Sequence, residues 1–534
     1  MKTLIRGGRI YDGTKAEPFV GDILVENDRI VKVHEMIDYS EADRIVDISG
    51  LSVAPGFIDA HSHNDWFAIK KEPLKYFDPF IRQGITSFVT GNCGLSATGF
   101  KADTPNVGKI GGGLFFYNDT TTGTYPSVKE FFDAIDHNTP CNIATLVGHC
   151  TARTGEAGYE NRELTPEEMK EMLGIMEQGL KDGACGLSLG LMYDPGAFAK
   201  VPELREVAKL CEKYGRPLTS HMRALSRVSM AFQPLLGRSH ILRAFDEMAQ
   251  VTKGLKMKFQ LSHSIFVGRK SFPDSKPLHE ALDKMREDGI DAMFDIYSEL
   301  LGVSVITCFL PDWYRALAPE KRGSLLTKLR LFILNFSVPL LGFGWDDIVL
   351  AYMGPGNEAL EGKTVGQYAR ENRIGGLEAY LRLCVLSDFN GRVNMGPYST
   401  EDIITWQSRK DDCLFMTDAW VEDFGVQNPA VYDCFPKFIR RSLLRLGDNL
   451  PGTIRKMSGA VADRFGLKDR GYLRPGCFAD ITVFDESAMK EAIPDQEKSF
   501  GIEKVWINGK LVLTDGELDA EALRTSGHAL RCGA

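Results

Sequence analysis

The stretch VAPGFIDAHSH, residues 53–63, runs from an apolar segment into two histidines, and segments of this kind recur along the chain. Eight such runs cover residues 53–63, 85–93, 142–149, 184–191, 217–221, 257–263, 290–297 and 413–418. Short, continuous apolar runs are typical of strands buried in a parallel sheet. Seven of the eight end in side chains that bind metals or titrate: His61 with His63, Cys93, His149, His221, His263, Asp295 with Tyr297, and Asp418.

The spacing of these strand ends predicts a barrel in which each strand is followed by a helix. Residues 61 and 93 lie 32 positions apart, and residues 221 and 263 lie 42 apart, which is room for one helix and two loops. One helix is predicted to begin after Thr165, because Thr165-Pro166-Glu167-Glu168 forms a capping box before apolar residues at helical spacing. We therefore expect an α/β fold based on a (β/α)8 TIM barrel, with functional groups gathered at the carboxyl ends of its strands.

The chain is longer than a barrel requires. It has 534 residues, whereas a barrel needs about 250. Residues 1–55 and 475–534 read as short strands and turns, so we expect one small β-sandwich formed by both termini around a barrel over 56–474. The 123 positions between Asp295 and Asp418 exceed one crossover, which predicts an inserted lid segment at about 299–375, after strand 7.

Composition and charge indicate a globular protein that acts on small molecules. The chain is 43% hydrophobic and 25% charged, and its net charge is −9. An acidic chain without a Lys and Arg cluster is a poor match for nucleic acid, and no segment reaches the ~18 apolar residues of a membrane helix. Eleven cysteines without paired spacing favour reduced thiols and a cytoplasmic protein. A homo-oligomer is possible.

The imidazole, thiol and carboxylate side chains at the ends of these runs predict a zinc centre. His61 and His63 share one face of an extended strand, because side chains two positions apart point the same way. Cys93, His221 and His263 would make a three-ligand set with an open fourth position, the pattern of a catalytic zinc. His61, His63 and Asp418 would form or flank a second, weaker site, so one tight ion is expected and a second is left open.

Asp418 is the predicted catalytic residue. Zinc lowers the pKa of water towards ~7 and polarises the carbonyl under attack. A carboxylate beside it would accept the proton of the attacking water and return it to the leaving nitrogen, which amide cleavage requires.

At these residues the chain resembles the amidohydrolase superfamily, and within it the D-aminoacylase, or N-acyl-D-amino-acid deacylase, branch. The motifs that carry the resemblance are PGFIDAHSH at 55–63, GNCG at 91–94, VGH at 147–149, GLMYDPG at 190–196, SHMR at 220–223, Ser262-His263, Thr417-Asp418 and RPGCFAD at 474–480. The resemblance implies that Cys93, His221 and His263 are the tight zinc ligands and that Asp418 is the general base. It also implies that Tyr193, Arg223 and Tyr297 face the substrate. His149 matches the family pattern without an assigned chemical step, so we place it with the substrate-binding residues and leave a structural hydrogen-bonding role open.

Two departures from the family concern the substrate. Members usually carry a lysine soon after the sixth-strand histidine and a His-Pro-Arg segment after the eighth-strand aspartate, both suited to a substrate carboxylate. Here the positions read His263-Ser264-Ile265-Phe266 and Asn428-Pro429-Ala430. The leading expectation is a zinc-dependent hydrolase of a linear amide such as an N-acyl-D-amino acid. The alternatives are a cyclic amidase of the hydantoinase or dihydropyrimidinase kind, a deaminase, and a scaffold that has lost catalysis.

Overall fold

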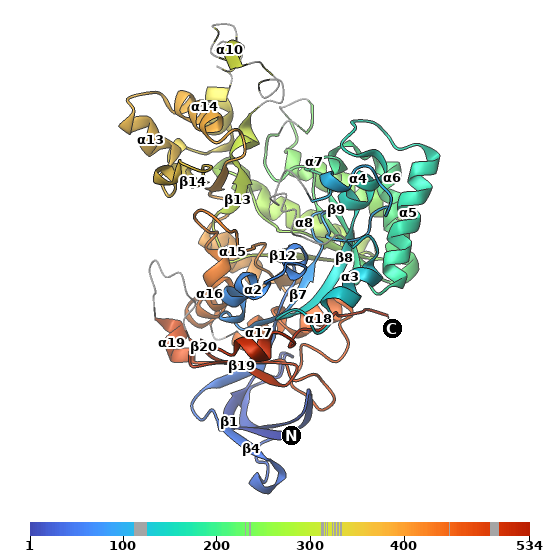
Figure 1. Cartoon of the computed structure of the whole chain (residues 1–534), viewed down its shortest axis with the longest axis vertical. Coiled ribbons are helices and arrows are strands. Elements are labelled where there is room, and N and C mark those ends of the chain that lie inside the picture. The colour runs from blue at the N-terminus through green and yellow to red at the C-terminus, as the bar shows by residue number, and fades with distance from the viewer. Residues whose placement is uncertain are drawn as a thin grey trace.

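In the computed structural model the chain folds into three regions along its longest axis (Figure 1). The structure describes all residues except 112–124, 230, 234–236, several positions between 311 and 333, 448, 492–500 and 534. The barrel lies in the middle, the strands of the two termini lie at one end, and the insert lies at the other. No helix within these described ranges is long and apolar enough to cross a membrane.

Eight parallel strands form the barrel, and each predicted run contributes one of them. In sheet order they are β16 (Cys413–Phe415), β12 (Asp291–Ile296), β11 (Lys258–Leu261), β10 (Pro217–His221), β9 (Gly186–Gly190), β8 (Asn142–Gly148), β7 (Ile85–Thr90) and β6 (Phe57–Asp59). The first and last strands also meet, because the Ala60 N–H donates to the Phe415 carbonyl at 3.3 Å. The predicted α/β barrel is therefore confirmed, with an almost closed sheet.

The helices of this region surround the sheet, and α5 begins as predicted. Thr165 caps α5 (Pro166–Lys181) with both hydrogen bonds of a capping box to Glu168. Gly215 ends α6 (Val201–Tyr214) in the left-handed conformation that glycine adopts without strain. The other helices here are α1 (Asp65–Ala68), α2 (Leu74–Ile81), α3 (Val128–Ile135), α4 (His149–Ala157), α7 (His240–Thr252), α8 (Ser275–Glu287), α15 (Glu401–Ser408), α16 (Ala430–Arg445), α17 (Leu450–Lys456) and α18 (Gly459–Phe465).

Strands from both termini pair in one nine-stranded sheet, as the sequence predicted for the two ends of the chain. They are β1 (Lys2–Ile10), β2 (Phe19–Glu26), β3 (Arg29–His34), β4 (Arg44–Asp47), β5 (Ser52–Pro55), β17 (Ile481–Phe484), β18 (Ile502–Ile507), β19 (Lys510–Thr514) and β20 (Glu517–Leu518), with the short helices α19 (Glu486–Lys490) and α20 (Ala520–Leu523) beside them. The two halves join where β17 pairs antiparallel with β5. The run 53–63 therefore contributes to both regions. β5 belongs to the sheet of the termini, and β6 begins the barrel after the single residue Gly56.

The insert between β12 and β16 has a small sheet of its own. Strands β13 (Gly302–Val305), β15 (Arg392–Met395) and β14 (Ile348–Tyr352) pair antiparallel in that order. Its described helices are α10 (Pro319–Arg322), α12 (Leu334–Leu341), α13 (Val365–Glu371) and α14 (Gly376–Leu386). Because β13 leaves the carboxyl end of β12, the insert lies on the side of the barrel where the predicted metal donors end their strands.

Candidate metal centre

The six predicted donors come from five strands and meet at one end of the barrel. His61 and His63 follow β6, Cys93 follows β7, His221 is the last residue of β10, His263 follows β11, and Asp418 follows β16. Three of them leave their strands with a positive φ, namely Cys93 at 53°, His263 at 32° and Asp418 at 48°. Residues other than glycine rarely adopt this conformation, and such strain concentrates at functional sites, where the surrounding structure maintains it.

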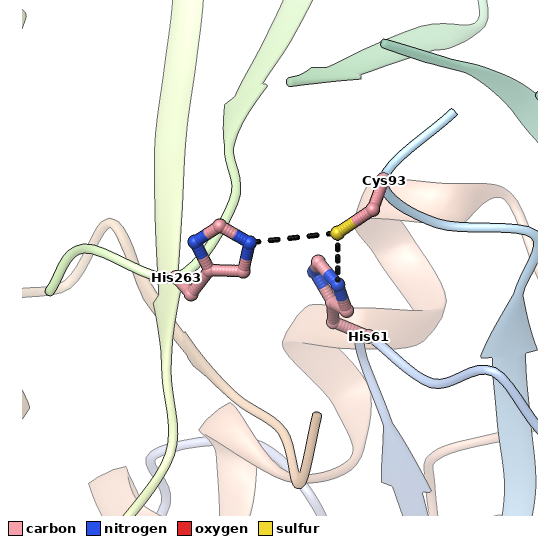
Figure 2. A group of neighbouring side chains, drawn as sticks. All are labelled: His61, Cys93 and His263. Atoms are coloured by element: carbon pink, nitrogen blue, oxygen red, sulfur yellow. Dashed lines mark hydrogen bonds between the residues drawn. The ribbon is translucent and has the colours of Figure 1, made fainter. Parts of the chain in front are cut away.

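Cys93 lies at the centre of the first donor cluster. Its Sγ is 3.3 Å from His61 Nε2, 3.4 Å from His221 Nδ1 and 3.5 Å from His263 Nε2. Figure 2 shows the imidazoles of His61 and His263 directed at this sulfur from two sides. All four side chains are buried. We call them the thiolate cluster.

The distances in the thiolate cluster fit a zinc ion. With Zn–S near ~2.3 Å and Zn–N near ~2.05 Å, tetrahedral coordination places sulfur and nitrogen ligands about 3.5 Å apart. The three observed Sγ to N distances of 3.3 to 3.5 Å match this value. The donor atoms of His61, Cys93 and His263 all lie within 4.8 Å of one another, close enough to hold one ion.

A second cluster, the carboxylate cluster, consists of His61, His63 and Asp418. Asp418 Oδ1 is 3.6 Å from the Nε2 atom of His61 and 3.6 Å from that of His63. The three donor atoms again lie within 4.8 Å of one another. The Asp418 side chain is 24% exposed while both histidines are buried, so within this cluster the carboxylate is the group in contact with solvent.

Electrostatics favour the metal-binding charge state at Cys93 and His221, whereas the carboxylate of Asp418 favours a protonated His63. Burial opposes ionisation of Cys93, but the imidazoles of His61, His221 and His263 lower the pKa of its thiol well below the usual range. Burial lowers the pKa of His221 to about 4, with His263 adding to the effect. Although burial disfavours the charged ring, hydrogen bonding to Asp418 raises the pKa of His63 to about 9. The thiolate and a neutral His221 are the forms that bind zinc.

Two aspartates that sequence reasoning did not assign to the site hold its ligands in place. Asp295 accepts the His263 N–H at 2.6 Å, and its Oδ1 lies 3.5 Å from His61 Nδ1. Asp59 accepts the N–H of His61 at 3.1 Å and the hydroxyl of Thr417 at 2.5 Å, linking the first and last strands of the barrel. Their sequence signals are weak, because each is one carboxylate at or near a strand end.

The two predicted substrate-binding tyrosines lie beside the donors. The Tyr193 hydroxyl is 3.1 Å from His221 Nδ1, and the two rings meet at 4.6 Å between centroids. Tyr297 directly follows β12 and is 5% exposed. Burial raises the pKa of Tyr297 well above its usual range, and the charge of Asp418 adds to the shift.

The other two predicted substrate residues are bound to the scaffold. Arg223 donates to Glu247 at 2.9 Å and to the carbonyls of Ala197 and Ala199 at 2.5 and 2.9 Å. His149 begins α4, and its Nε2 lies 2.8 Å from Glu203, which also accepts from Arg153. Because protein groups engage both side chains, their contact with substrate stays a prediction.

Residues 44–297, which carry the first seven barrel strands and five of the six donors, match the description "Amidohydrolase family", and relatives matched over most of the chain extend the likeness. By this match and these relatives, the chain is similar to the amidohydrolase family. It is 27% identical to D-aminoacylase from Alcaligenes xylosoxydans xylosoxydans over 518 residues, which covers 95% of this chain and 93% of the relative. It is also 27% identical to N-acyl-D-glutamate deacylase from the same organism over 512 residues, covering 95% and 92%.

Two solved structures resemble this chain over nearly its whole length. N-acyl-D-glutamate deacylase from Bordetella bronchiseptica, solved with zinc and a phosphonate inhibitor, has 25% identity and a TM-score of 0.76, with 99% of each chain covered. D-hydantoinase from a Thermus species has 13% identity and a TM-score of 0.53, and covers 99% of this chain and 98% of its own. The second comparison shows the shared fold alone.

Proposed function

We propose that this amidohydrolase is a zinc-dependent deacylase of linear N-acyl compounds, with N-acyl-D-amino acids as the leading substrate class. The observation that carries the proposal is the thiolate cluster with Asp418 beside it. The sequence relatives matched over most of the chain include D-aminoacylase and deacylases of N-acyl-D-glutamate and N-acyl-D-aspartate. Zinc in the related deacylase from Bordetella bronchiseptica supports the choice of metal.

In this proposal the thiolate cluster holds the tight ion. Cys93, His221 and His263 are its ligands, with His61 shared between this cluster and the carboxylate cluster. A bound zinc would polarise the amide carbonyl and lower the pKa of the attacking water. A second ion at the carboxylate cluster remains part of the proposal as the weaker site.

Asp418 moves the proton. Although its surroundings are buried, hydrogen bonding to His63 and the nearby imidazoles hold the pKa of the Asp418 carboxyl below its usual range, so the residue is an ionised base at neutral pH. It would accept a proton from the attacking water and donate it to the leaving amine nitrogen, which cannot depart as an anion. Its 24% exposure allows it to reach a substrate at the entrance.

Tyr193 and Tyr297 would position the substrate. Both hydroxyls come from segments that follow barrel strands, and Tyr193 contacts the His221 ring directly. A tyrosine kept protonated by burial can donate to a carbonyl oxygen as charge develops on it. We assign both residues to the substrate amide rather than to its amino-acid side chain.

The test is amine release from a defined panel. The zinc-loaded protein is incubated with N-acetyl and N-formyl derivatives of D- and L-amino acids, and free amine is measured. We expect release from D compounds and none from the Asp418→Asn protein at equal zinc content. Zinc-loaded protein that releases amine from no panel member would refute deacylation.

A further inference from the structure

The second nitrogen of His221 has an unusual partner for a metal ligand. His221 faces the thiolate cluster through Nδ1, which lies 3.4 Å from Cys93 Sγ, so Nε2 is left for another contact. Among the described residues this nitrogen has one hydrogen-bond partner, the thioether Sδ of Met192 at 3.4 Å. Metal-binding histidines usually donate their other N–H to a carboxylate, a carbonyl or water. A thioether is a weaker acceptor than any of these.

The neighbours of Met192 in the chain hold its backbone beside the His221 ring. Met192 lies in the loop after β9, and the N–H of Leu191 donates to the His221 carbonyl at 3.0 Å. On the other side of Met192, the Tyr193 hydroxyl lies 3.1 Å from His221 Nδ1. Because both neighbours contact His221, the sulfur of Met192 is placed at Nε2 by the loop as well as by its own side-chain torsions.

Met192 also connects the buried metal centre to solvent. The residue is 47% exposed, whereas His221, which it contacts, is 4% exposed. Among the methionines that the structure describes, only Met1 and Met36 are exposed as well. Solvent-exposed methionines are common targets of oxidation to the sulfoxide. Met192 therefore combines exposure to an oxidant with a direct contact to a predicted zinc ligand.

Oxidation would change the acceptor that the His221 Nε2–H group meets. The thioether sulfur donates an electron pair to one oxygen of hydrogen peroxide, the O–O bond breaks, and water leaves as the S=O bond forms. The sulfoxide oxygen is a stronger acceptor than the thioether, and an unbranched side chain can withdraw far enough to accommodate it. A stronger acceptor on Nε2–H raises the basicity of the imidazole and therefore its affinity for zinc.

We propose that Met192 is an oxidation site and a positioning residue of the metal centre, and that its sulfoxide holds His221 by a stronger hydrogen bond and tightens zinc binding. The proposal rests on the proposed function only through the zinc ion, because it requires His221 to be a ligand and requires no particular substrate. It makes zinc affinity depend on exposure to peroxide, and enzymatic reduction of the sulfoxide reverses the change.

Substitution of Met192 tests the hydrogen bond without an oxidant. Leucine has a similar size and no acceptor, whereas glutamine has a similar length and presents a carbonyl oxygen. We expect Met192→Leu to bind zinc about threefold more weakly than wild type and Met192→Gln about threefold more tightly, the effect of one weak hydrogen bond. Competition with a fluorescent chelator measures the affinity. A merely structural role would not place glutamine above methionine, and equal affinities in the three proteins would overturn the proposal.

Treatment of the zinc-loaded protein with hydrogen peroxide tests the modification itself. Peptide mass spectrometry should find one added oxygen on Met192, and zinc affinity should rise about threefold. Methionine sulfoxide reductases of both stereospecific classes should remove the oxygen and restore the original affinity. Met192→Leu protein treated in the same way shows any contribution from oxidation of Cys93, and we expect no rise in its affinity.

Met36→Leu is the matched control for the position of the oxidised methionine. Met36 is 78% exposed and follows β3 in the sheet of the termini, so its oxidation should leave the metal centre unchanged. Peroxide should therefore still tighten zinc binding in Met36→Leu protein. Unmodified Met192 beside oxidised Met36, or oxidised Met192 with unchanged zinc affinity, would overturn the proposal. None of these measurements uses amine release, whose absence from every panel member defines failure of the proposed function.

Discussion

The thiolate cluster and the carboxylate cluster share His61 and differ in their contact with solvent. Cys93 is 2% exposed and has imidazole nitrogens at 3.3 to 3.5 Å, whereas Asp418 is 24% exposed and has imidazoles at 3.6 Å. A buried site with a soft donor retains a metal, and an accessible carboxylate can exchange protons with a substrate. This difference supports our proposal that one cluster holds the ion and that the other performs the proton chemistry.

The largest effect is expected from Cys93→Ala. Removing the only sulfur donor of the thiolate cluster should abolish stoichiometric zinc, and amine release with it. Cys211→Ala is the control, because Cys211 is also buried but lies on α6 and donates to the Pro217 carbonyl. Zinc analysis after dialysis checks the result, and full zinc in the Cys93 variant would remove the distinction between the clusters.

Asp418→Asn should separate metal binding from catalysis. The amide keeps the size of the side chain but cannot accept the proton, so kcat should fall by about 10²–10⁴-fold. Tight zinc should stay, because the thiolate cluster is unchanged. Steady-state kinetics and zinc analysis on the same preparation measure both quantities, and parallel loss of zinc and activity would make Asp418 primarily a ligand.

Asp295→Asn tests whether the Asp295 carboxylate helps to position the histidines of the thiolate cluster. Asp295 accepts from the His263 N–H and from Gln260 Nε2 at 2.8 Å, and it lies near His61 Nδ1. Loss of its charge should reduce zinc affinity by about 10–100-fold, as is usual for groups that orient metal ligands. Competition with a chelator gives the affinity, and a value equal to wild type would assign Asp295 to folding alone.

The smallest effect is expected from His63→Ala. His63 belongs to the carboxylate cluster alone, so its loss should weaken a second equivalent of zinc and leave the first in place. Titration of metal-free protein with zinc, followed by calorimetry, resolves the two steps. If the first equivalent is lost as well, the two clusters act as one binuclear site.

Much of the fold was predictable because its signals are local. A buried parallel strand is a short apolar run, and a capping box such as that at Thr165 lies within four residues. The boundary at Gly56 was less visible, since one uninterrupted apolar run feeds both β5 and β6. Its division depends on antiparallel pairing of β5 with β17, which is more than 400 residues away.

The hydrogen-bond partners of the residues around the metal centre could not be predicted from the local sequence. Arg223 matches a family motif, but its guanidinium is bound by Glu247, and His149 is bound by Glu203. Each of these pairs joins separate elements of the barrel, so the sequence around either residue does not indicate its partner. Asp59 and Asp295 are the opposite case, because sequence reasoning gave them no role. In the structure each accepts a hydrogen bond from the backbone N–H of a predicted metal ligand, His61 and His263 respectively.

The sequence by itself determined the eight strands, the donor types at their ends and therefore the class of chemistry, because parallel strands in a barrel must deliver their carboxyl ends to one place. Only the tertiary structure decided which donors lie close enough to share an ion and which cations are already paired. Those outcomes depend on contacts between strands and helices that are far apart in the sequence, and periodicity does not report such contacts.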